Sequence, residues 1–285
     1  MSTIDQFEST FRSAVKPLYT PEKITLSNVL IISDCEAEVT QRFQIQLQNY
    51  LSALTTQEQS LNLQLLCTEQ SQDLDQLLET INDLNPQLIV THRHLHSQNK
   101  EHLYTLGDHI EVLTQITEVP ILLFPKAIVQ NKNPLEVPNK ILILTDQLLE
   151  HPSLVDYALS FMGETGQLSL AHIEDEIQFE RYMDMVSKIP EIDTESARNC
   201  LKEQMYKDAQ DFFSVIDQSI KDEKLNIEVR ASFRMGHKLK TYVSIASEDA
   251  VELVVIQGKD EDQIAMHGLS YPLAVELNHL PLLIV

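Results

Sequence analysis

Two kinds of segment alternate along the chain. Short, continuous apolar runs indicate strands that are buried on both faces, as in a parallel sheet. Between them, apolar residues recur every three or four positions, which is typical of amphipathic helices. The predicted strands are 28–33, 61–67, 87–91, 120–124, 140–145, 167–172, 226–230, 251–255 and 281–285. This alternation predicts an α/β fold of the doubly wound, parallel-sheet kind.

Helical spacing of apolar residues predicts the other elements. The expected helices are 1–16, 39–54, 71–84, 106–118, 154–161, 237–249 and 268–279. Residues 125–139 hold three prolines and no helical period, so we interpret this stretch as a linker. Residues 174–223 are expected to be helical and acidic, and they are longer than a crossover between two strands requires.

A Gly and a Pro recur at the same spacing near the end of each half. Gly107 stands 13 residues before Pro120, and Gly268 stands 13 residues before Pro281. In both places the Pro opens an apolar run, a position that a strand tolerates. The chain has only 6 Gly, so the matched pair indicates a duplication of domain size.

The second half contains KILILTD (140–146), RMGHKLKTYVSIA (234–246), VELVVIQG (251–258) and a final PLLIV. In these pieces and their order it resembles the universal stress protein family over residues 138–285. The first half resembles the same family over residues 24–124 but lacks one strand-helix unit. The resemblance implies two tandem Rossmann-like domains of the adenine nucleotide alpha hydrolase-like kind.

This resemblance sets the expected organisation of the chain. Residues 1–23 would form an N-terminal helical extension, 24–124 a degenerate first domain, 125–137 a linker, and 138–285 a second domain with a helical insertion at about 174–223. Members of the family usually pair through their final strand. The resemblance therefore implies that 120–124 and 281–285 pair in an intramolecular pseudo-dimer.

Nucleotide-binding members of the family cradle phosphates with a G-x-x-G-x9-G-[ST] loop, in which backbone N–H groups approach the ligand closely. Here Gly258 and Gly268 are kept, but Glu261 replaces the second glycine and the interval to Gly268 is too short. Leu269 follows Gly268, which displaces Ser270 by one position. The carboxylates at 260–262 would each oppose a phosphate by about 1 kcal/mol.

The resemblance therefore implies a degenerate nucleotide site, and we expect no cofactor. The alternative is a sensor of ATP or AMP that uses the second domain only, at Asp146, Gly258, Gly268 and Ser270. Asp34 matches Asp146 in the first half. Each of these two aspartates is either a contact to the nucleoside or a turn and helix-cap residue after a buried strand.

A second alternative is a metal-binding regulator. Five of the ten histidines lie within 92–109, and His92, His94 and His96 alternate as they would along one face of a strand. This segment leaves the carboxyl end of a predicted strand, where doubly wound folds bind ligands. A Zn²⁺ site completed by Asp108 or Glu111 is one hypothesis, and a polar loop that replaces the glycine-rich one is the other.

Charge and cysteine content exclude several classes of partner. The formal net charge of −22 disfavours nucleic acid and anionic membranes, since phosphates would be repelled.

No apolar run approaches the ~20 residues that span a bilayer, and we expect no signal peptide. Three scattered cysteines, of which Cys35 could be either a reactive thiol or a structural residue, indicate a reduced, cytoplasmic protein.

No arrangement of a nucleophile and a base can be assembled from the sequence, so we expect a protein without catalytic activity. The helical insertion, which is rich in apolar residues, is the best candidate surface for a protein partner. The expected function is that of a non-catalytic tandem universal stress protein, a regulatory or protein-interaction module of a stress response.

Overall fold

The computed structural model describes residues 19–54, 61–67, 71–97, 104–144, 152–259, 266 and 268–285. The helix predicted over 1–16 lies outside these residues. Within the described part of the chain, nine strands form one sheet in the order β2-β1-β3-β4-β9-β8-β5-β6-β7. The strands are β1 (Asn28–Ile32), β2 (Asn62–Leu66), β3 (Leu88–His92), β4 (Ile121–Phe124), β5 (Lys140–Leu144), β6 (Thr165–Asp175), β7 (Asn226–Gly236), β8 (Leu253–Ile256) and β9 (Leu282–Ile284).

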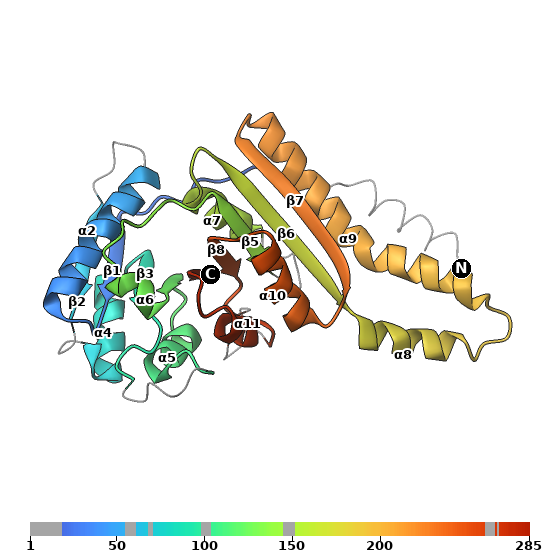
Figure 1. Cartoon of the computed structure of the whole chain (residues 1–285), viewed down its shortest axis with the longest axis horizontal. Coiled ribbons are helices and arrows are strands. Elements are labelled where there is room, and N and C mark those ends of the chain that lie inside the picture. Colours follow the sequence, from blue (N-terminus) through green and yellow to red (C-terminus); the bar gives the residue numbers. More distant parts are fainter. Residues whose placement is uncertain are drawn as a thin grey trace.

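Helices cover both faces of this sheet (Figure 1). They are α2 (Ala37–Leu54), α4 (Leu74–Leu84), α5 (Asp108–Ile116), α6 (Lys126–Gln130), α7 (Ser153–Phe161), α8 (Glu176–Val186), α9 (Thr194–Asp222), α10 (Lys238–Glu248) and α11 (Ser270–Glu276). Buried side chains of α2, α7 and α9 share one core layer with Val29 and Ile31. Those of α4, α5, α10 and α11 share the other with Leu30 and Ile32. Because successive strand residues face opposite layers, the apolar runs are buried on both sides, and the predicted doubly wound α/β fold is confirmed.

The strand order of the second half is matched by the first half with one strand fewer. β5 lies between β6 and β8 as β1 lies between β2 and β3, and β9 and β4 come last in each series. Nothing in the described first half corresponds to β7, which agrees with the missing strand-helix unit. All neighbouring strands are parallel except β4 and β9, which pair antiparallel with Leu122 opposite Leu283. The pairing expected for the two closing strands is therefore observed.

The structure corrects two of the predicted elements. The proposed linker contains a short helix, α6, which begins directly after Pro125. β6 and β7 are 11 residues each, longer than predicted, and they pair along their whole length. The acidic segment between them is a helical hairpin, with α8 and the start of α9 extending beyond the sheet (Figure 1).

None of the described helices combines the length and the apolar character that crossing a membrane requires.

Candidate functional site

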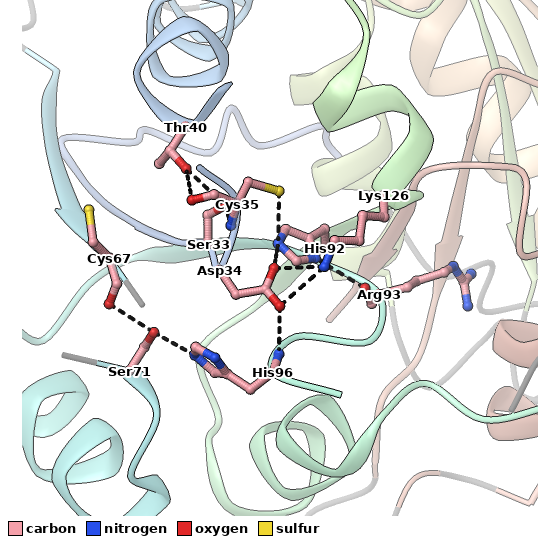
Figure 2. A network of polar contacts seen from close by, with 10 residues as sticks. All are labelled: Ser33, Asp34, Cys35, Thr40, Cys67, Ser71, His92, Arg93, His96 and Lys126. Atoms are coloured by element: carbon pink, nitrogen blue, oxygen red, sulfur yellow. Dashed lines mark hydrogen bonds and ion pairs between the residues drawn. The ribbon is translucent and has the colours of Figure 1, made fainter. Parts of the chain in front are cut away.

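A polar cluster lies where β1 and β3 end side by side at the carboxyl edge of the sheet. Asp34 and Cys35 follow β1, and His92 is the last residue of β3. β1 connects through α2 to β2 on one side, while β3 lies on its other side. Such a point, where the strand order reverses direction, is where open α/β sheets bind ligands. Figure 2 shows the side chains of the cluster directed at one another.

The carboxylate of Asp34 is the centre of the cluster. His92 Nε2 lies 3.0 Å from its Oδ1, and Lys126 Nζ donates to Oδ1 and Oδ2 at 2.8 and 3.1 Å. The backbone N–H of His96 donates to Oδ2 at 2.9 Å. The side chain of Asp34 is 12% exposed and that of His92 is 1% exposed. Both oxygens of Asp34 are thus bonded within the protein.

These contacts lower the pKa of Asp34 and raise the pKa of His92. Burial would raise the pKa of Asp34, but the hydrogen bonds from His92 and Lys126 outweigh burial and hold that pKa well below its usual range. Burial would lower the pKa of His92, but its hydrogen bond to Asp34 raises the pKa to about 9. His92 Nδ1 lies 3.0 Å from the carbonyl oxygen of Arg93, so the charged imidazolium donates from both nitrogens.

Cys35 adds a sulfur to the same cluster. Its Sγ lies 3.7 Å from His92 Nε2, and its backbone N–H donates to Ser33 Oγ at 3.2 Å. Thr40 Oγ1 donates to the Cys35 carbonyl at 3.1 Å, which fixes the turn that leads into α2. Burial raises the pKa of the Cys35 thiol, but the hydrogen bond with His92 more than reverses that effect, so the pKa is lowered overall.

The predicted alternation of His92, His94 and His96 along a strand is wrong. β3 ends at His92, and the next residues form a turn in which His94 and His96 have φ of 57° and 56°. The ring of His96 instead bonds Ser71 Oγ at 2.8 Å and lies 4.8 Å from the ring of His109. The turn reverses the chain, so the three imidazoles do not share one face of a strand.

The carboxylates that we considered as further metal ligands are placed elsewhere. Glu111 Oε1 accepts a hydrogen bond from Tyr271 at 2.7 Å, and Asp108 lies in the first turn of α5. Within the described residues, the three side chains grouped closely enough to hold a metal ion are Asp34, Cys35 and His92. Of the predicted set, the structure brings only His92 into such a group.

The candidate nucleotide residues of the second half are only partly described. Asp146 lies outside the described residues. Gly258 follows β8 and donates its N–H to the carbonyl of Val285 at 2.7 Å, so it packs against the end of β9. Gly268 has open space where a side chain would stand, and Ser270 begins α11 with a buried side chain.

Two residues that contribute to the site were missed by sequence analysis. Lys126 lay in the predicted linker, although it directly follows Pro125 after a strand, as a first-turn helical residue can. Arg93 is 3% exposed and donates to the carbonyl of Leu277 in the second half at 3.2 Å. Burial lowers the pKa of Arg93 to about 10. Their partners lie 92 and 184 positions away, so no local pattern could have identified these contacts.

Comparisons with known proteins add similarities at the level of the fold. No family model matches the chain, and no curated protein matches it. One similar solved structure is a universal stress protein from Archaeoglobus fulgidus DSM 4304, with 12% identity, a TM-score of 0.47, and coverage of 91% of this chain and 96% of that one. Another, described as a candidate universal stress protein, comes from Pseudomonas aeruginosa UCBPP-PA14, with 13% identity, a TM-score of 0.49, and coverage of 92% and 93%. A third, from a hypothetical protein whose structure served to assign its biochemical function, covers 52% of this chain and 95% of its own, with 16% identity and a TM-score of 0.40.

Proposed function

We propose that the chain is a tandem, non-catalytic module of the universal stress protein kind, which acts by binding another protein through the hairpin of α8 and the start of α9. The two units would be residues 24–124 and 138–285, joined as an intramolecular pseudo-dimer. A role in a stress response follows from the family resemblance alone.

The sheet supports the tandem part of this proposal. The two series of strands, β2-β1-β3-β4 and β7-β6-β5-β8-β9, run inward from the two edges and meet at β4 and β9. Antiparallel contact between equivalent strands is what a two-fold relation between two units produces. Hydrogen bonds from Lys259 to the carbonyl of Gln115, at 2.9 Å, and from Tyr271 to Glu111 add contacts between the same two units.

The observation that carries the binding part is the apolar surface of the hairpin. Among the described residues, five of the nine large apolar side chains that are exposed lie between residues 177 and 192. They are Ile177, Tyr182, Met185, Ile189 and Ile192. Clustered exposed apolar side chains with a polar rim mark protein interaction sites. Here Glu176, Glu180, Arg181 and Asp184 supply that rim. Because Glu180 and Asp184 are already paired with Arg198 and Lys188, a partner with an apolar patch and a polar edge of mixed charge fits best.

The polar cluster at the ends of β1 and β3 supports the proposal that the first unit does not bind a nucleotide. Asp34, which matches the aspartate that contacts the nucleoside in binding members of the family, has both oxygens bonded to His92, Lys126 and the His96 backbone. A nucleoside would have to break these bonds before it could use the carboxylate. Each charge-assisted hydrogen bond to Asp34 that is lost in this way costs about 1.5–3 kcal/mol of binding free energy.

The test is capture of partners from the cells that produce the protein, compared between two matched triple variants. Ile177→Ser, Met185→Ser and Ile189→Ser remove exposed side chains of the hairpin. Ile45→Ser, Ile116→Ser and Leu225→Ser remove exposed side chains elsewhere. Both variants should fold, since surface substitutions change stability by about 0.5 kcal/mol or less each.

A partner retained by the unmodified chain and by the second variant, but lost by the hairpin variant, is the expected result. Equal capture by both variants would contradict the proposed binding surface. Quantitative mass spectrometry after cross-linking measures the difference.

A further inference from the structure

We propose that Asp34, Cys35 and His92 form a binding site for Zn²⁺ at the carboxyl ends of β1 and β3. This inference is independent of the proposed protein-binding function. It differs from the histidine-rich site predicted from the sequence, because only one of those histidines takes part. One carboxylate oxygen, one sulfur and one imidazole nitrogen lie within 4.8 Å of one another.

The distances between these atoms suit a tetrahedral ion. With a Zn–S distance of about 2.3 Å and a Zn–N distance of about 2.0–2.1 Å, the sulfur and nitrogen are separated by roughly 3.5 Å. Cys35 Sγ and His92 Nε2 are 3.7 Å apart. A nitrogen and a carboxylate oxygen on the same ion are separated by about 3.3 Å, and His92 Nε2 and Asp34 Oδ1 are 3.0 Å apart. The third pair, Cys35 Sγ and the Asp34 carboxylate oxygen, lies within 4.8 Å, whereas a sulfur and an oxygen on one ion are separated by roughly 3.5 Å. Movement of the Cys35 and Asp34 side chains by up to about 1 Å would complete the geometry.

His92 is held in the orientation that a zinc ligand requires. Its Nδ1 faces the carbonyl oxygen of Arg93 at 3.0 Å, which leaves Nε2 as the nitrogen that points into the cluster (Figure 2). A hydrogen bond from the second ring nitrogen to a backbone carbonyl is the usual support for a histidine that binds a metal. Because His92 is almost fully buried at the end of β3, its side chain loses little conformational entropy when Zn²⁺ binds.

The donor set selects the kind of metal. A thiolate and an imidazole favour zinc and other late transition metals, whereas Mg²⁺ and Ca²⁺ require mainly oxygen ligands. Three protein ligands leave a fourth position for water or another small ligand. Binding displaces the protons of Cys35 and of His92 Nε2, as metal binding to such ligands generally does.

Lys126 is the competitor for this site. Its ammonium group lies 2.8 Å from the Asp34 oxygen that would bind the ion, and its side chain is 36% exposed. Lys126 can therefore swing into solvent when Zn²⁺ enters. Removing the positive charge of Lys126 should therefore strengthen Zn²⁺ binding at this site. Zn²⁺ bound adventitiously elsewhere on the surface would not respond to the loss of Lys126.

The experiment titrates the metal-free full-length chain with Zn²⁺ in the presence of a competing chelator. We expect one strong site per chain, with affinity reduced roughly 100-fold or more in Cys35→Ser because a ligand is lost. The matched controls Cys67→Ser and Cys200→Ser remove exposed cysteines and should bind as the unmodified chain does. Lys126→Met should bind roughly tenfold more tightly, since one like charge is removed at contact distance.

A second measurement on the unmodified chain is independent of whether the variants fold. One equivalent of Zn²⁺ should slow alkylation of Cys35 by iodoacetamide roughly tenfold or more, because the thiolate is bound, and should leave Cys67 and Cys200 unaffected. Equal alkylation of Cys35 with and without Zn²⁺, or equal affinity in Cys35→Ser and Cys67→Ser, would overturn the proposal.

Discussion

Single residues at the carboxyl edge of the sheet decide what can bind there. Asp34 is surrounded by three donors, and the turn after β3 supplies one of them through its backbone. This turn depends on Gly107, whose φ of +96° is one that other residues rarely adopt. A Cβ at Gly107 would lie 2.8 Å from His94 Cα. Both the backbone angle and the close approach therefore require a glycine.

Gly107→Ala should lower the free energy of unfolding by about 2–4 kcal/mol, because the new methyl group meets backbone and the φ is strained. Gly268→Ala is the matched control. Gly268 has the same place in the second closing segment, but among the described residues other than its chain neighbours no atom lies within 4 Å of its ideal Cβ, so we expect a change of about 0.5 kcal/mol or less. Denaturant unfolding measures both, and indistinguishable midpoints would refute this account of Gly107.

At the scale of elements, the repeated Gly and Pro spacing predicted the two closing strands, and the continuous apolar runs predicted the buried sheet. Residues 231–236 of β7 were not predicted, because their sequence, ASFRMG, forms no apolar run. α6 is five residues between prolines, too short for a helical period. His94 and His96 were misplaced because a tight turn gives no signal in the alternation of residue types.

The segment before β1 illustrates a contact between elements that no pattern predicts. Asp156 in α7 is buried and accepts hydrogen bonds from the Tyr19 hydroxyl and from the Glu22 N–H, the latter at 2.8 Å. Ile24 N–H donates to Ser160 Oγ in the same helix at 2.9 Å. Residues 19–24 are thereby fixed to a helix of the second half.

Asp156→Ala should lower the free energy of unfolding by about 1–3 kcal/mol, since two part-buried hydrogen bonds to its carboxylate are lost. It should also speed tryptic cleavage after Lys23, which is already exposed. Asp184→Ala is the control, because its ion pair with Lys188 is exposed on α8 and such pairs contribute about 0–1 kcal/mol. Equal cleavage rates in the two variants would contradict the proposed anchoring.

At the scale of the whole molecule, one sheet joins the two halves of the chain. It separates the polar cluster around Asp34 from the exposed apolar side chains of the α8 hairpin. The polar cluster lies at the carboxyl ends of β1 and β3, and the apolar hairpin of α8 extends from the opposite end of the sheet (Figure 1). The class of the sheet and the pairing of its two closing strands could be predicted from the sequence and its family resemblance. The polar cluster could not, because Lys126 and His92 reach Asp34 across 92 and 58 positions of the chain.

The central claim is that this scaffold binds a protein and not a nucleotide. Calorimetric titration of the full-length chain with ATP, ADP and AMP tests it most directly. We predict no heat of binding up to about 1 mM nucleotide, which corresponds to a binding free energy weaker than about −4 kcal/mol. Micromolar affinity for any of the three, abolished by Asp34→Ala or by Gly268→Asp, would contradict the account.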